Sequence, residues 1–230
     1  LIVTSATYRQ SSRAQPALRV RDPENKLLAR GPRIRLEAEL IRDAALRTSG
    51  LLAPRIGGAS VYPPQPAGIT SEGVFGRVNW KVSTGTDRYR RGLYTFSKRT
   101  APFAAFTTFD ASSGEGCIAR RNRSNTPLQA LTLLNDAMFV ELAQHLALEA
   151  EKLAVDKRIE FLFRKFLARL PTRNEATLMK QFLETQRQRL GKGELKASQI
   201  MGQKNATAEQ AALALLARSI MNLDETVTKQ

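Results

Sequence analysis

The sequence predicts a mainly α-helical fold, a helical bundle with an irregular Arg/Gly/Pro-rich segment that bears a few short strands. Apolar residues recur at helical spacing through residues 126–230, and three capping boxes mark helix starts there. The 230 residues are 42% apolar, which is enough for a globular core. We expect one domain, residues 1–230, with a basic part at 1–125 and a bundle part at 126–230. Because it opens on Leu1 rather than Met, we interpret it as a fragment of a longer protein.

The front part contains one predicted helix followed by a long loop. Residues 33–48 predict a helix, because Leu36 and Leu40 recur at helical spacing and Gly50 follows as a stop signal. Residues 50–76 hold so many glycines and prolines that neither a helix nor a central strand fits. A loop of this length is usually functional or disordered.

Residues 77–110 predict two or three short strands. Aromatic and β-branched residues, which favour extended backbone, gather at 78–82, 93–96 and 106–109. These pieces are the short strands of the predicted fold class.

The rear part predicts four helices, at about 126–152, 159–170, 173–190 and 207–223. Three of them begin with a threonine followed three residues later by Gln or Glu, the pattern of a capping box. These pairs are Thr126–Gln129, Thr172–Glu175 and Thr207–Gln210. The last helix ends in Asp224 and Glu225, which oppose the helix dipole, so we expect a salt bridge from there to the basic front part.

The charge is strongly positive and uneven. Lys and Arg number 36 against 21 acids, a net charge of +15; residues 1–125 carry 21 basic and 9 acidic residues, a net charge of +12. Such a charge suits nucleic acid, and the helices around Pro171 resemble a helix-turn-helix. We do not expect sequence-specific recognition, because the basic excess lies in the other half of the chain and the second helix begins Asn174-Glu175-Ala176-Thr177.

Arginines in two clusters are candidate anion-binding residues, because a guanidinium group pairs in a two-pronged way with carboxylate, phosphate or sulfate. The second cluster directly precedes the helix start at Thr126, whose dipole favours anions. The candidates are Arg88, Arg90, Arg91, Lys98, Arg99, Arg120, Arg121, Arg123 and Asn125. The alternative is that these arginines pair with buried carboxylates and brace the irregular segment.

Catalytic candidates are weaker. Asp110 and Glu115 could act as the paired acids of a polysaccharide hydrolase. Cys117 lies near arginines that could lower its pKa, but nothing marks His145 as its base.

With one cysteine and one histidine, the chain excludes an internal disulfide, a zinc knuckle and a Cys-x-x-Cys-His haem site. We expect no metal site and no cofactor in this chain. No apolar run approaches the length of a membrane span.

Several long motifs resemble those of the planctomycete secreted domain family, also catalogued as domain of unknown function 1553. They lie at residues 5–12, 22–28, 35–44, 87–96, 98–102, 125–136 and 221–225, the first reading Ser-Ala-Thr-Tyr-Arg-Gln-Ser-Ser. The resemblance implies the C-terminal part of a large exported, periplasmic or secreted protein with an upstream cytochrome-c-like domain. Any haem would then bind upstream. The family supplies no catalytic residues to carry over.

Three hypotheses follow. The first is a non-catalytic extracytoplasmic module that binds an anionic partner, an acidic glycan or an acidic face of a neighbouring domain, through an outward-facing arginine surface. The second is a hydrolase that uses Asp110 and Glu115. The third is a structural brace for the upstream haem-binding domain, with the arginines paired internally.

Overall fold

The computed structural model describes residues 1–12, 15–69 and 79–229. They are mainly helical with a single two-stranded sheet in the described part, which confirms the predicted fold class. The chain divides into two compact units, Leu1–Leu36 with Asp224–Gln230 and Glu37–Leu223. Within Glu37–Leu223, α2 and α3, which are defined below, pack against helices of the predicted bundle part.

The smaller unit joins the two ends of the chain through a short antiparallel sheet. Its elements are η1 (Ile2–Thr4), α1 (Pro16–Arg21), β1 (Ile34–Arg35), α10 (Asp224–Val227) and β2 (Thr228–Lys229). Ile34 lies opposite Lys229 in the register of the two strands. The Asp224 carboxylate accepts from Arg33 and from Arg35 at 3.5 Å, which confirms the expected salt bridge to the basic front part.

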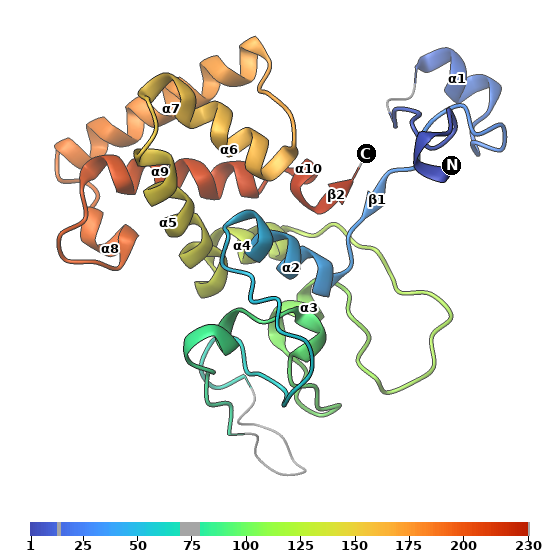
Figure 1. Cartoon of the computed structure of the whole chain (residues 1–230), viewed down its shortest axis with the longest axis horizontal. Coiled ribbons are helices and arrows are strands. Elements are labelled where there is room, and N and C mark those ends of the chain that lie inside the picture. The colour runs from blue at the N-terminus through green and yellow to red at the C-terminus, as the bar shows by residue number, and fades with distance from the viewer. Residues whose placement is uncertain (13–14, 70–78, 230) are drawn as a thin grey trace. The chain divides into compact units, whose positions relative to one another are not determined.

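The larger unit contains the bundle, residues 127–221, and the irregular segment, residues 49–126 (Figure 1). Its helices and helical turns are α2 (Ala38–Thr48), η2 (Gly85–Tyr89), η3 (Gly92–Tyr94), α3 (Ala104–Thr108), α4 (Pro127–Asn135), α5 (Ala137–Glu151), η4 (Val155–Lys157), α6 (Arg158–Leu167), α7 (Arg173–Gly191), α8 (Ala197–Met201) and α9 (Ala208–Met221). Among these described helices, none is long and apolar enough to cross a membrane.

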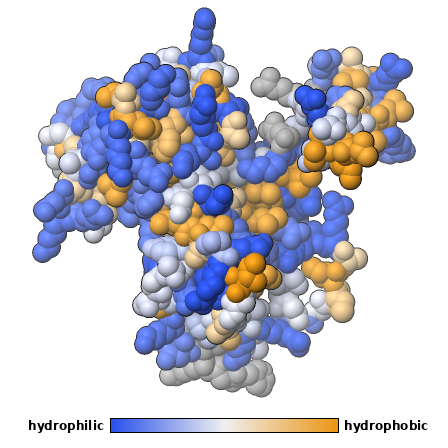
Figure 2. All heavy atoms as spheres, in the orientation of Figure 1, coloured by the Kyte–Doolittle hydropathy of each residue, from blue (hydrophilic) through white to orange (hydrophobic). Residues whose placement is uncertain are grey.

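Helix α9 lies at the centre of the bundle and packs against α4, α5, α6, α7 and α8. Small side chains let α5 and α9 approach closely: Ala143 and Ala147 on α5 and Ala211 and Ala217 on α9 are fully buried. Phe163 of α6 fills the remaining core. The bundle face seen in Figure 2 is mostly hydrophilic over α6 and α7, as expected when apolar side chains point inward.

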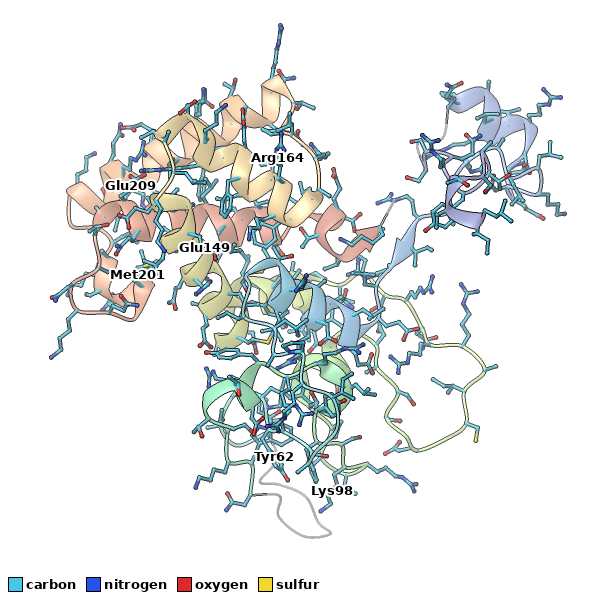
Figure 3. The ribbon with its side chains drawn as sticks, in the orientation of Figure 1. Tyr62, Lys98, Glu149, Arg164, Met201 and Glu209 are labelled. Atoms are coloured by element: carbon cyan, nitrogen blue, oxygen red, sulfur yellow. The ribbon has the colours of Figure 1, made fainter. Side chains whose placement is uncertain are left out.

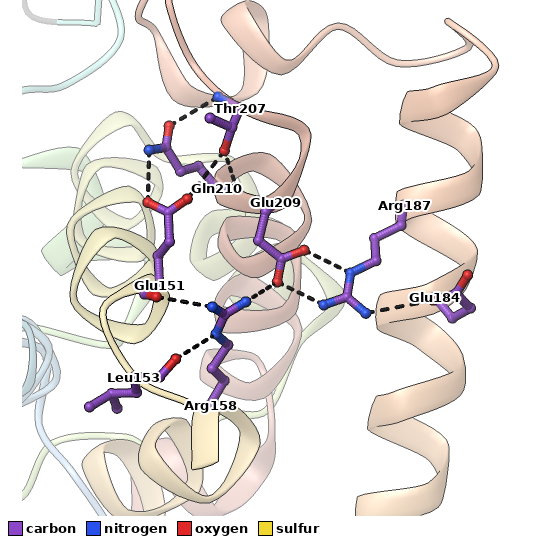
Figure 4. A network of polar contacts seen from close by, with 8 residues as sticks. All are labelled: Glu151, Leu153, Arg158, Glu184, Arg187, Thr207, Glu209 and Gln210. Atoms are coloured by element: carbon purple, nitrogen blue, oxygen red, sulfur yellow. Dashed lines mark hydrogen bonds and ion pairs between the residues drawn. The ribbon is translucent and has the colours of Figure 1, made fainter. Parts of the chain in front are cut away.

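An ion network links three helices of the bundle (Figure 4). Glu209, in the first turn of α9, accepts from Arg187 of α7 at 2.7 Å and from Arg158 of α6 at 2.5 Å. These hydrogen bonds outweigh the partial burial of Glu209 and lower the pKa of its carboxyl. The network therefore fixes the start of α9 against two neighbours.

Two capping boxes are confirmed, and the third is half-formed. Thr172 with Glu175 and Thr207 with Gln210 make both reciprocal hydrogen bonds. Thr126 accepts from the backbone N–H of Gln129, but the Gln129 side chain donates elsewhere. The expected long helix at 126–152 is two helices, because Asp136 is extended and its carboxylate accepts from Met138 N at 2.9 Å, which starts α5 afresh.

The strands expected within 77–110 are largely replaced by helical turns. Residues 104–108 form α3 and residues 92–94 form η3, while residues 77 and 78 lie outside the described part. Two isolated parallel bridges, Ala53 with Arg90 and Val61 with Thr95, are the extended pairings in this described segment. The aromatic side chains that suggested strands pack on one another instead: Phe103 stacks on Trp80 at 5.7 Å.

Candidate functional site

Arg42, on α2, anchors residues 88–90 of the irregular segment to this helix. Its side chain is 2% exposed and donates to the backbone carbonyls of Arg90 and, at 3.0 Å, of Arg88. Burial lowers the pKa of Arg42 to about 10, although the nearby carboxylates of Asp43 and Asp136 act to raise it. The group is therefore charged at neutral pH and holds two loop carbonyls that regular structure does not satisfy.

Arg90 is a second buried arginine that donates to backbone carbonyls of the irregular segment. It is 1% exposed and donates to the carbonyls of Ala59, at 3.1 Å, and of Gly57. Its guanidinium lies 3.8 Å from the centre of the Tyr94 ring, and the Tyr94 hydroxyl accepts from Gly57 N at 2.8 Å. Arg42 thus holds residues 88–90, and Arg90 in turn holds the loop at 55–59.

Three further predicted arginines have internal carboxylate partners. Arg88 donates to Glu141 at 2.8 Å. Arg91 pairs with Asp43 at 3.3 Å, and Arg121 pairs with Glu39 at 2.7 Å. The expectation of one outward-facing surface therefore does not hold for Arg88, Arg90, Arg91 and Arg121. Arg90 is buried under its own loop, and the other three are engaged by acids of α2 and α5.

Beside these pairs lies a cavity of about 430 Å³, within the usual range for a small-ligand site. Helix α2 contributes Glu39 and Asp43, and η3 contributes Gly92. Glycine suits this close approach to α2, because a Cβ at Gly92 would lie 3.0 Å from the Glu39 Cβ, tighter than an ordinary contact. Further lining residues come from 91–97, 102–107 and the loop before α4, and include Phe96, Ser97, Phe103, Phe106, Thr107, Ser112 and Arg121.

The cavity is charged but internally paired. Arg121 donates to both oxygens of Glu39, at 2.7 and 3.1 Å, and lies 3.2 Å from Glu37. Partial burial acts to raise the pKa of Glu39, but the hydrogen bonds and charge of Arg121 outweigh it and the pKa is lowered. Asp43 accepts from Gly92 N at 2.6 Å and from Arg91. Because its pKa is lowered, Glu39 is ionised at neutral pH.

Two basic segments border this cavity. Ser97 lines it, and Lys98 and Arg99 follow directly in the chain; Arg121 lines it, and Arg120 and Arg123 lie within two residues. Arg99, Arg120 and Arg123 are exposed and make no ion pair or hydrogen bond within residues 1–12, 15–69 and 79–229. Asn125 is also exposed. Figure 3 labels Lys98 in the irregular segment, together with Tyr62.

Asp110 and Glu115 have different surroundings. The Asp110 carboxylate accepts from Ser124 N at 2.7 Å, Ser124 Oγ at 2.9 Å and Gln129 Nε2 at 3.4 Å. It borders a second cavity, of about 480 Å³, in which Glu115 takes no part. Glu115 is exposed in the loop beyond. Asp110 thus links the loop at Ser124 to Gln129 of α4, and the structure does not bring Asp110 and Glu115 into one cleft.

The single cysteine and the single histidine are likewise not joined. Cys117 is exposed in the loop before α4. His145, on α5, lies 4.0 Å from Glu149. Among the described residues, no three His, Cys, Asp or Glu side chains are placed to hold a metal ion.

Sequence reasoning missed the acids and phenyl rings of the cavity. The available signal was Glu39 and Asp43, two acids four residues apart on one helix face within a basic half of the chain. Their partners Arg91 and Arg121 lie 48 and 82 residues away, and no local pattern connects them.

Comparison with known protein families identifies the family of this chain. Residues 1–183 match the family described as PSD1, a protein of unknown function (DUF1553). No curated protein and no solved structure matches the chain. Because the match spans most of the 230 residues, the chain belongs to the PSD1 (DUF1553) family of unknown function.

Proposed function

We propose that this domain is a non-catalytic module that binds an acidic polysaccharide through Arg99, Arg120 and Arg123. One observation carries the proposal: these three exposed arginines have no ion-pair or hydrogen-bond partner among the described residues, and they lie within two chain positions of Ser97 and Arg121, which line one cavity. Guanidinium groups bind the carboxylates and sulfates of such polymers in a two-pronged way.

The cavity favours a polysaccharide over the flat acidic face of a protein. Its lining combines carboxylates, hydroxyls and the rings of Phe96 and Phe106, and its volume of about 430 Å³ can accommodate a sugar ring. A few placed polar groups beside aromatic rings are typical of a site that orients a compact ligand.

The cellular setting of the proposal rests on the family resemblance. We propose that the module lies outside the cytoplasm, either in the periplasm or as part of a secreted protein. It then lies C-terminal to further domains of the same polypeptide. Any haem belongs to that upstream part, and the module itself uses no cofactor in binding.

A second candidate function is a structural brace for an upstream haem-binding domain. The observation that favours it is the internal use of five arginines, Arg42, Arg88, Arg90, Arg91 and Arg121. This reading predicts co-purification with the upstream domains and no binding to any isolated polyanion.

Retention on heparin resin under a rising salt gradient tests the first proposal. The triple variant Arg99→Ala/Arg120→Ala/Arg123→Ala should elute at clearly lower salt than the wild type, because exposed charge contacts are screened by salt. A matched control removes three exposed cations of the bundle that make no ion pair or hydrogen bond with any described residue, in Arg164→Ala/Arg173→Ala/Lys180→Ala.

Both triple variants lower the net charge by three. If they elute together, retention reflects net charge alone and the proposed site is wrong. If the wild type passes through the resin at low salt, the brace reading replaces it.

A further inference from the structure

We infer that the cavity between α2, η3 and α3 holds an uncharged sugar unit, while the bordering arginines take the charges of the neighbouring units. The inference rests on the proposed function and adds the class of polysaccharide. It predicts a polymer in which acidic and uncharged units alternate.

The charge of the cavity excludes an acidic unit from its interior. Three carboxylates, Glu37, Glu39 and Asp43, face two guanidinium groups, Arg91 and Arg121, which leaves a formal charge of −1. Arg121 is already shared between two acids. A carboxylate or sulfate placed here would meet engaged donors and like charge, and both lower its affinity.

An uncharged pyranose suits the same groups. A carboxylate held by arginine keeps free acceptor positions, because its two oxygens offer about four lone-pair sites. Sugar hydroxyls can donate to Glu39, whose side chain is 29% exposed, and exchange hydrogen bonds with Ser97 and Ser112. The apolar C–H face of the ring can pack on Phe96 and Phe106, which also line the cavity.

The negative cavity and the neighbouring arginines then set where the ligand carries charge. Arg99, Arg120 and Arg123, which have no ion-pair or hydrogen-bond partner in the described part of the chain, lie within two positions of cavity-lining residues and do not line the cavity themselves. A ligand that satisfies both regions carries an uncharged unit with an acidic unit on either side. A polymer made only of acidic units would push one charge into the negative cavity.

Isothermal titration calorimetry with two oligosaccharides of equal charge tests the inference. A hyaluronan hexasaccharide carries three carboxylates that alternate with uncharged N-acetylglucosamine units, and trigalacturonic acid carries three on consecutive units. We expect the wild type to bind the hexasaccharide about tenfold more tightly, the ratio that one lost hydrogen bond to a charged group produces.

The variant Glu39→Gln removes the charge and keeps the shape. It should bind trigalacturonic acid more tightly than the wild type does, so that the ratio between the two ligands falls toward one. The matched control is Glu149→Gln, the same change on α5 outside the cavity, which should leave the ratio unchanged. Trp80 fluorescence verifies that both variants are folded.

The outcomes separate the two claims. If the wild type binds neither oligosaccharide, the proposed function fails. If it binds both with equal affinity, or if Glu39→Gln leaves the ratio unchanged in a folded protein, the inference is overturned while the proposed function stands.

Discussion

Replacing Arg42 by alanine should loosen the irregular segment while the bundle stays folded. The Arg42 guanidinium donates to the carbonyls of Arg88 and Arg90, and Arg90 in turn holds the loop at 55–59. Loss of the first anchor therefore releases the second. Helices α5, α7 and α9 gain their contacts from one another and depend little on this anchor.

The size of the effect follows from two opposing contributions. Two hydrogen bonds from a charged donor contribute about 1.5–3 kcal/mol each, and both acceptors would lose their partner in the variant. The cost of burying the charge offsets part of this gain, as the lowered pKa of Arg42 shows. We expect a net loss of about 2–4 kcal/mol in the unfolding free energy of the segment.

Trp80 provides the readout. It is the single tryptophan of the chain, its Nε1 donates to Pro63 O at 2.7 Å, and its ring stacks on Phe103. Its fluorescence therefore reports the irregular segment, while circular dichroism at 222 nm reports mainly the helices. In urea, the fluorescence midpoint of Arg42→Ala should fall by about 1–2 M, ahead of the helical transition.

Two further variants make this test specific. Arg42→Lys keeps a charge but lacks the fork that reaches two carbonyls, so it should behave like the alanine variant. Arg88→Ala removes an ion pair with Glu141 in which both side chains are 28% exposed, and should cost only about 1 kcal/mol. A fluorescence midpoint for Arg42→Ala no lower than that of Arg88→Ala would refute the anchoring role.

Two other predictions concern the bundle. Hydrogen bonds from Arg169 lower the pKa of Glu175 from 4.5 to about 2, so this carboxylate stabilises the fold above pH 4.5 and the contribution is lost as the pH falls to about 2. Glu175→Gln should therefore lower the melting temperature at pH 7 and have little effect at pH 2; an equal effect at both values would contradict the ionic origin. Phe163→Ala removes a fully buried ring from α6 and should cost about 3–5 kcal/mol in urea unfolding followed at 222 nm, whereas a loss below about 1 kcal/mol would show that the core collapses around the site.

The rear helices could be predicted from sequence because their signals are local. Thr172 and Thr207 each stand three residues before the side chain that completes the capping box, and the apolar stripe of α6 repeats within two turns. The break at Asp136 could not be predicted in this way. Apolar periodicity continues across it, whereas the extended backbone of Asp136 ends α4 and the hydrogen bond from Met138 N to its carboxylate caps α5.

The irregular segment and the cavity depend on contacts between distant residues. Phe106 has a strand-forming composition around it, yet it lies in α3, and Phe103 just before that helix stacks on Trp80, 23 residues earlier, at 5.7 Å. The acceptors of Arg42 and Arg90 are backbone carbonyls, which every residue carries and no sequence pattern marks. The count of arginines therefore indicated an anion site or a brace, and the structure contains internally paired arginines beside unpaired ones.

Hydrogen exchange of the wild type with and without the hyaluronan hexasaccharide tests the central claim most directly. Amide protection should increase at residues 95–99 and 118–124, which border the cavity, and stay unchanged in α7. Protection confined to the bundle or to residues 1–36, or none at ligand concentrations that saturate binding, would contradict the assignment of the site.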